Sequence, residues 1–161
     1  MTAVTKVSPF SASTLGYVTG DCAGDVVVNE YFIDVTAAQI DAGNMFDVGI
    51  LPAYHTVVDM ILIPDDLDTG TPAITLDVGL LSGTPGDAIS DRTIGAEFFS
   101  ASTAAQGGTA TRMSLASGFK VKPTESDRSI GVKVVADAAT AAAGRIRLLC
   151  FMAPADHQVQ F

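Results

Sequence analysis

Residues 145–152, RIRLLCFM, carry the pattern that decides the fold class. The even-numbered positions are all apolar, whereas the odd-numbered positions begin with two arginines. Because side chains of a β-strand point alternately to opposite faces of the sheet, this pattern predicts a strand with one buried face and one outer face. Residues 74–81, ITLDVGLL, and residues 129–136, SIGVKVVA, alternate in the same way. Three such strands predict a core that lies against the face of a sheet.

Outward from these strands, apolar runs of strand length alternate with clusters of Gly, Pro, Asp, Thr and Ser. The runs predict eight strands, over residues 26–35, 45–51, 56–63, 73–81, 109–116, 119–121, 129–136 and 145–152. The alanine-rich residues 93–106 predict one short helix, and residues 138–144 predict a hairpin loop. Eight short strands with at most one helix predict an all-β protein, a β-sandwich of jelly-roll or Greek-key type, with a closed barrel as the alternative.

The first 24 residues differ in composition from the rest of the chain. They are rich in Thr, Ser, Ala and Gly, and their few large apolar residues follow no clean period. Such a segment becomes ordered only against the rest of the fold or another chain. We therefore predict an extended N-terminal arm over residues 1–24 and one β-sandwich domain over residues 25–161.

The chain is acidic, with 18 acidic and 9 basic residues and a formal net charge of −9. This charge disfavours nucleic acid and anionic membranes as partners, because both attract clustered Lys and Arg. No apolar stretch has the length of a signal-peptide core or the roughly 18 residues of a membrane span. We expect neither nucleic acid nor a membrane as partner.

The charge is unevenly divided along the sequence. Residues 25–91 contain twelve acids and no Lys or Arg, whereas residues 92–161 contain eight bases and five acids. Strands from the two halves that interleave in a Greek-key sandwich would mix these charges in space. Alternatively, an acidic face meets a basic face on a neighbouring subunit and steers assembly.

Two predicted strands have apolar outer faces that need a cover. Residues 57–63 are apolar apart from Asp59, and the outer face of residues 145–152 changes from arginine to apolar side chains. Large apolar patches usually mark interfaces, so the cover is either the chain's own arm and loops or another subunit. We predict a homotrimer whose subunit interface contains four outer residues, Arg145, Arg147, Leu149 and Phe151.

Residues 64–72, PDDLDTGTP, are the one candidate metal site, because Asp65, Asp66 and Asp68 could offer oxygen ligands to calcium. The spacing does not fit a helix–loop–helix calcium loop, and the same residue types suit a solvated turn. We predict no metal and no cofactor. His55 and His157 are the only histidines, Cys22 and Cys150 stand alone, and no catalytic motif is present, so we do not expect an enzyme.

Four runs together carry a resemblance: GNMFDVGILPAYHTVVDMILIPDDLDTGTPAITLDVGLLSGTPGD (43–87), RTIGAEFFSASTAAQGG (92–108), RMSLASGFKV (112–121) and DRSIGVKVVADAATAAAGRIRLLCFM (127–152). Over residues 25–152 the chain resembles the small virion structural proteins encoded beside the major capsid protein of tailed phages. The resemblance implies a capsid decoration, or cement, protein. Such a protein binds the major capsid protein on the outside of the shell and ties neighbouring capsomers together, typically as a trimer.

The resemblance also implies a jelly roll whose arm adds to β-structure of the capsid, and a protein made in the host cytoplasm and located on the virion. An extended arm gains affinity through main-chain pairing at a sheet edge. The candidate capsid-binding residues of the arm are its apolar side chains, Val7, Phe10, Leu15 and Tyr17. The alternatives are a tail, vertex or head-fibre protein that binds host surfaces or glycans, and a small non-viral β-sandwich binding module.

Overall fold

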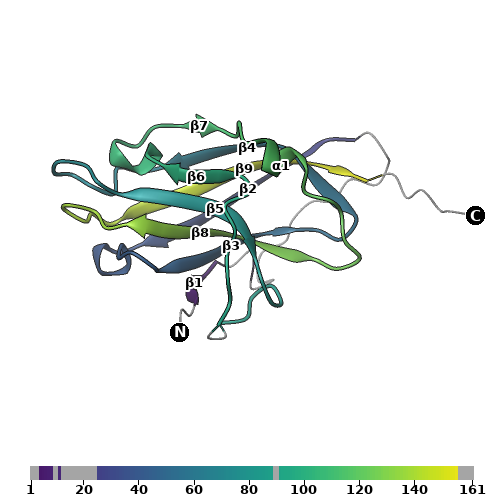
Figure 1. Ribbon diagram of the computed structural model, residues 1–161, viewed down its shortest axis with the longest axis horizontal. Coiled ribbons are helices and arrows are strands. Elements are labelled where there is room, and N and C mark those ends of the chain that lie inside the picture. The colour runs from purple at the N-terminus through teal and green to yellow at the C-terminus, as the bar shows by residue number, and fades with distance from the viewer. Residues whose placement is uncertain (1–3, 9–10, 12–24, 89–90, 156–161) are drawn as a thin grey trace, which may run out of the picture.

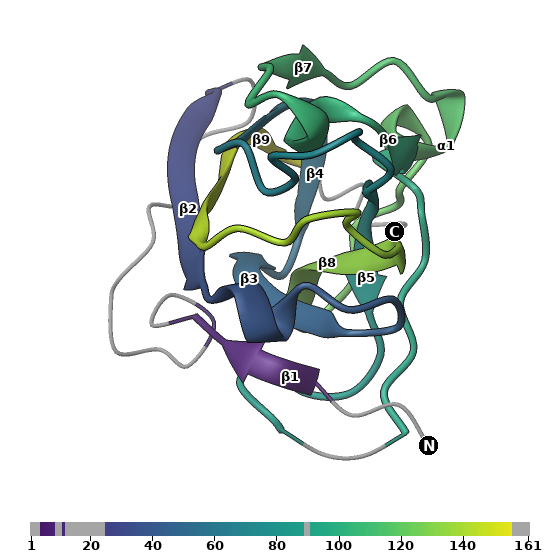
Figure 2. The same ribbon diagram turned by 90° about the vertical axis from the view of Figure 1, so that its left-hand side faces the viewer.

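The computed structural model describes residues 4–8, 11, 25–88 and 91–155, which form two packed β-sheets (Figure 1). One sheet has five strands, in the order β1 (Val4–Val7), β3 (Met45–Leu51), β8 (Arg128–Ala136), β5 (Thr75–Leu81) and β6 (Phe99–Ser102). The other sheet has four, in the order β2 (Val27–Val35), β9 (Gly144–Pro154), β4 (His55–Pro64) and β7 (Thr111–Arg112). The helical elements are short, namely α1 (Ala116–Phe119) and two 3-10 turns, η1 (Ala37–Gln39) and η2 (Ala104–Gln106). Figure 2 shows the two layers from one end.

The strand pairs are nested around the β5–β6 pair. Strand β4 pairs with β7, β3 with β8 and β2 with β9, all antiparallel. This nesting, distributed over two sheets, is the strand order of a double-sheet jelly roll. The predicted fold class, a β-sandwich with at most one short helix, is therefore confirmed, and the closed barrel is excluded. None of the helices in the described part of the chain has the length and apolar character needed to cross a membrane.

The core lies between the two sheets and follows the alternation seen in the sequence. Buried positions of β9 face buried positions of β5 and β8, and the contributing side chains include Ile146, Leu148, Cys150, Leu76, Val78, Val132 and Val134. The aromatic Tyr31 and Phe46 and the aliphatic Leu62 fill the space between them and are fully buried. Alternation therefore identified the inner face of the sandwich correctly.

The prediction of a helix over residues 93–106 is wrong. The segment instead runs beside β5, where Gly95 N–H and Phe98 N–H donate to carbonyls of β5 at 3.1 and 3.0 Å, and then forms β6 and η2. Burial of the adjacent Phe98 and Phe99 decides the outcome, because tertiary packing outweighs the helix propensity of alanine.

Two further predicted strands are also corrected. Only Thr111–Arg112 of the strand predicted over 109–116 pairs, and residues 119–121 form no strand, because the chain turns through α1 (Ala116–Phe119) just before. The predicted loop over residues 138–144 is confirmed up to Gly144, where β9 begins.

The connection between β5 and β6 folds back over the outer face of the five-stranded sheet. Ile94 and Leu81 form a bridge, and Ile94, Leu81, Met45 and Val7 make a small apolar cluster on that face. A Cβ atom on Gly131 would lie 2.4 Å from the Leu81 side chain. Position 131 of β8 therefore has to be glycine, because a larger residue would collide with the apolar cluster that covers it. The chain thus covers part of one outer face of the sandwich with its own residues.

Candidate functional site

The four residues predicted as a subunit interface lie together on β9. Arg145, Arg147, Leu149 and Phe151 are half-buried and alternate with fully buried neighbours. Strand β9 pairs with β2 on one side and β4 on the other, so these side chains occupy the middle of the outer face of the four-stranded sheet. We call this surface the β9 face.

Neighbouring strands add apolar side chains to the β9 face. Val28 of β2 pairs with Phe151, and Ile61 of β4 pairs with Leu149. A β-bulge in β4 leaves Val58 38% exposed beside them, and Val28 is 50% exposed. The apolar part of the β9 face consists of Val26, Val28, Phe32, Val58, Ile61, Ile63, Leu149 and Phe151.

The charged side chains of the β9 face pair with one another. The guanidinium of Arg145 binds both carboxylate oxygens of Asp34, at 2.6 and 2.9 Å, and stacks 4.1 Å from the centre of the Phe32 ring. Arg147 lies 3.9 Å from Glu30, and Arg112 lies 2.5 Å from Asp59. The hydrogen bond from Arg145 lowers the pKa of Asp34 below its usual value, and Asp34 raises the pKa of Arg145.

These pairs bear on the uneven charge of the sequence. Four ion pairs of the described residues, Arg92–Asp47, Arg112–Asp59, Arg145–Asp34 and Arg147–Glu30, each join an acid from residues 25–91 to a base from residues 92–155. This is the pattern that interleaved strands produce, because β2 and β4 flank β9 in one sheet. Arg145 and Arg147 therefore find their acidic partners within the chain.

The predicted metal-ligand candidates do not gather around a common centre. Asp68 is 1% exposed and its oxygens accept backbone N–H groups of Ala73, Ile74, Ala139 and Thr140 at 2.7 to 3.1 Å. Asp65 and Asp66 are exposed, and Asp65 accepts the N–H of Arg145 at 2.8 Å. Within the described residues no group of three or more His, Cys, Asp or Glu side chains is placed to hold a metal ion. Asp68 instead joins the β4–β5 loop to the β8–β9 loop.

Replacing Asp68 by asparagine should lower the melting temperature by about 5 °C or more, because one of its two acceptor oxygens becomes an NH2 group that faces backbone donors. The hydrogen bond from Ala73, with those from Thr140, Ala139 and Ile74, holds the pKa of Asp68 well below its usual 3.8. The stabilisation is present above pH 3.8 and is lost as the pH falls through the lower folded-state value. Calorimetry from pH 7 to pH 2 should show the two proteins converging in acid; the control, Asp66→Asn, should match the wild type.

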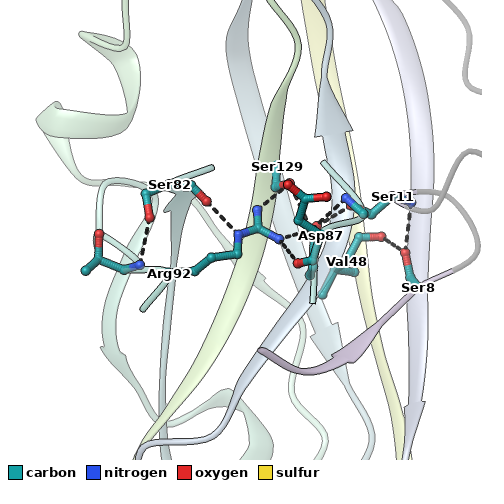
Figure 3. A network of polar contacts seen from close by, with 10 residues as sticks. Ser8, Ser11, Val48, Ser82, Asp87, Arg92 and Ser129 are labelled. Atoms are coloured by element: carbon teal, nitrogen blue, oxygen red, sulfur yellow. Dashed lines mark hydrogen bonds and ion pairs between the residues drawn. The ribbon is translucent and has the colours of Figure 1, made fainter. Parts of the chain in front are cut away.

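A second polar cluster lies on the outer side of β3 and escaped the sequence analysis (Figure 3). Asp47 is fully buried, and its Oδ2 accepts from Arg92 Nη1 at 2.7 Å, Ser129 Oγ at 2.9 Å and Gly86 N at 3.2 Å. Arg92, itself 4% exposed, also donates to Ser82 O at 2.6 Å and Asp87 O at 2.7 Å. The one sequence signal was a carboxylate inside the otherwise apolar run of residues 45–51.

The same cluster holds the described part of the predicted arm. Strand β1 pairs in parallel with β3, Ser8 N–H donates to Asp47 O at 2.7 Å, and the Ser11 hydroxyl donates to Asp47 Oδ1. The side chain of Val7 packs against Met45 and Leu81 of the chain's own sheet. The other three candidate arm residues, Phe10, Leu15 and Tyr17, lie outside the described residues.

Three groups of catalytic type among the described residues are buried or hydrogen-bonded within the fold. Cys150 is buried, and burial raises the pKa of its thiol. His55 is buried with Nδ1 2.8 Å from Ala53 O, and the Ser117 hydroxyl donates to Glu97 O at 2.7 Å. A shallow cavity of about 250 Å³ between β6 and β7 is lined mainly by Ser and Thr hydroxyls, with Arg112 as its charged side chain. This arrangement contains no nucleophile–base pair.

Three solved structures to which this chain is similar are all of phage capsids. A chain of the capsid of Ralstonia phage GP4 is 41% identical with a TM-score of 0.88, over 91% of this chain and 96% of that one. A chain of the cyanophage Pam1 capsid asymmetric unit is 30% identical with a TM-score of 0.66, over 86% and 91%. A chain of the acid-stable capsid of Helicobacter pylori bacteriophage KHP30 shares the fold, at 14% identity, a TM-score of 0.54 and coverage of 83% and 92%. No protein-family model and no curated protein sequence matches.

Proposed function

The chain belongs to a family of phage capsid proteins, that of the matched chains from Ralstonia phage GP4 and cyanophage Pam1, and from this premise we propose that it is a capsid decoration protein. It is a virion structural protein. In the proposed role it binds the outside of the shell, contacts the major capsid protein and stabilises the junctions between neighbouring capsid subunits. It does so as a homotrimer, without a cofactor and without enzymatic activity.

The observation that carries the proposal is the match to the Ralstonia phage GP4 chain, because it extends over 96% of that chain at 41% identity. A match of this extent concerns the whole folded unit rather than a shared motif. Two properties of the molecule support decoration as the role within the capsid. Its net acidic charge is poorly suited to packaged nucleic acid, and three described side chains of catalytic type, His55, Ser117 and Cys150, are buried or hydrogen-bonded within the fold.

The proposed capsid contact uses the arm. Strand β1 stands at the end of its sheet, with β3 as its one neighbour among the described strands, so its second edge can accept an extended strand. The apolar arm residues Phe10, Leu15 and Tyr17 are proposed to insert into the capsid surface beside that edge. Val7 supports the contact indirectly by fixing β1 to the sheet.

Replacing Phe10, Leu15 and Tyr17 together by serine should reduce the occupancy of the protein on capsids about tenfold or more, because apolar anchors dominate binding energy at such contacts. The variant should keep the wild-type melting temperature, since β1, Ser8 and Ser11 are intact. Val135→Ser, at an exposed apolar residue of β8, is the matched control and should bind normally. Undiminished occupancy of the triple variant would rule out the arm as the capsid contact.

The role itself is tested by counting copies on purified virions and by adding the protein back to particles that lack it. A decoration protein is present in hundreds of copies, saturates the particles on re-addition and raises the temperature at which they open. A few copies per particle would instead assign the protein to a tail, vertex or head fibre. Its absence from particles would refute the virion role.

A further inference from the structure

We infer that the β9 face is the surface on which a second copy of this chain docks. The inference rests on the proposed function, in which copies of the chain assemble with one another. It goes further by assigning the contact to one face of the sandwich and by stating why that face, rather than the remaining surface, can accept a like-charged copy.

The first argument is the apolar area that the fold leaves uncovered. Val26, Val28 and Val58 are 54%, 50% and 38% exposed, and they account for half of the six large hydrophobic residues that are exposed among the described residues. Val28 pairs with the half-buried Phe151, Val26 directly precedes β2, and Val58 lies in the bulge of β4 next to Asp59, the other partner of Phe151. The three valines therefore gather at the Phe151 end of the β9 face. Contiguous apolar patches on small proteins mark interaction sites.

The second argument is the contrast between the two outer faces. On the five-stranded sheet the β5–β6 connection and β1 cover the apolar residues Met45 and Leu81, which are 2% and 4% exposed. On the β9 face the central residues remain half-buried and the residues at its end stay exposed. Within the described residues, the chain therefore covers an apolar cluster on one outer face and leaves the apolar centre of the β9 face without such a cover.

The third argument is charge, and it selects the partner. The chain carries a formal net charge of −9, so two copies repel each other over most of their surface. The β9 face is the exception, because its acids Glu30, Asp34 and Asp59 are matched one to one by arginines. The excess of nine acids lies elsewhere on the molecule. Because the β9 face is neutral and has an apolar centre, two copies of this acidic chain can approach each other through it without that repulsion.

The test introduces a carboxylate into the patch and measures assembly in solution. Val28→Glu is the main variant because Val28 is 50% exposed and can be replaced without disturbing the core, and Leu149→Glu places the charge at the centre of the face. Phe119→Glu is the matched control, since Phe119 is 52% exposed on α1 and is not one of the residues of the β9 face. Native mass spectrometry and light scattering over a concentration series give the mass, and thermal unfolding verifies the fold.

We expect Phe119→Glu to assemble as strongly as the wild type. For Val28→Glu and Leu149→Glu we expect the dissociation constant of the assembly to rise about 30-fold or more. Assembly of Val28→Glu at wild-type strength would overturn the inference. A wild type that is monomeric throughout, together with loss of Val28→Glu from capsids, would assign the face to the capsid protein and overturn the inference while leaving the decoration role intact. If the protein is absent from virions the proposed function fails, yet the mass measurement still decides whether copies dock through this face.

Discussion

Replacing Arg92 by methionine is expected to lower the free energy of unfolding by about 3–5 kcal/mol, because the change strands the buried carboxylate of Asp47 without its cation. The methionine keeps much of the side-chain volume, so the loss reflects charge and hydrogen bonds rather than a cavity. Arg92 also donates to the carbonyl oxygens of Ser82 and Asp87, and these acceptors lose their partner at the same time.

Urea unfolding followed by circular dichroism measures this effect. Arg147→Met is the matched control, because it removes an ion pair to Glu30 in which the two side chains are 36% and 55% exposed. Exposed pairs contribute little, so the control should unfold close to the wild type. Equal destabilisation by the two substitutions would contradict the claim that burial of the Asp47–Arg92 pair makes its loss costly. The double replacement of Asp47 and Arg92 by apolar residues should recover part of the loss.

Replacing Gly79 by alanine is expected to destabilise the protein by about 2–3 kcal/mol through overpacking. A Cβ atom at Gly79 would lie 2.2 Å from the carbonyl oxygen of Gly95 and 2.4 Å from Glu97 Oε2. Neither neighbour can simply move away, because Gly95 N–H and Glu97 Oε2 are both hydrogen-bonded to Leu80. The substitution therefore pushes the β5–β6 connection off the sheet.

The same urea titration measures this second effect, and limited proteolysis locates it. Cleavage within residues 82–97 should accelerate in Gly79→Ala and not in Gly107→Ala. Gly107 is the control because no atom lies within 4 Å of its would-be Cβ and its backbone is extended, at φ −168°. Wild-type stability of Gly79→Ala would show that the connection does not rest on the sheet at this position.

Much of the sandwich was predictable because its long strands alternate apolar and polar residues. Strands β5, β8 and β9 were expected within two residues of their observed ends, since one face of each packs in the core. Residues 93–106 were mistaken for a helix because local composition says nothing of the hydrogen bonds that Gly95 and Phe98 make to β5. Those bonds depend on how a long connection folds back, which is a tertiary property.

For the candidate site, the sequence predicted which side chains of β9 share a face but not which residues of other strands lie beside them. Alternation alone placed Arg145 and Leu149 on one outer face, because it needs only the strand itself. The residues that contact Arg145 and Leu149 depend on which strands flank β9. The Asp34–Arg145 pair, whose members are 111 positions apart, could therefore not be predicted from the sequence. The buried Asp47–Arg92 pair was hidden for the same reason, because its members lie 45 positions apart in the sequence.

The hydrogen bonds that Ser8 and Ser11 make to β3 affect how the predicted arm could bind a capsid. With Ser11 held on Asp47 and β2 beginning at Val27, the intervening chain is attached to the sandwich at both of its ends. The described residues on both sides of residues 12–24 are thus fixed to the sandwich. A chain closed at both ends has fewer conformations to lose on binding, so a capsid contact made by it requires less ordering than one made by a loose terminus. Extensions added before residue 4 would then leave these two points of attachment unchanged.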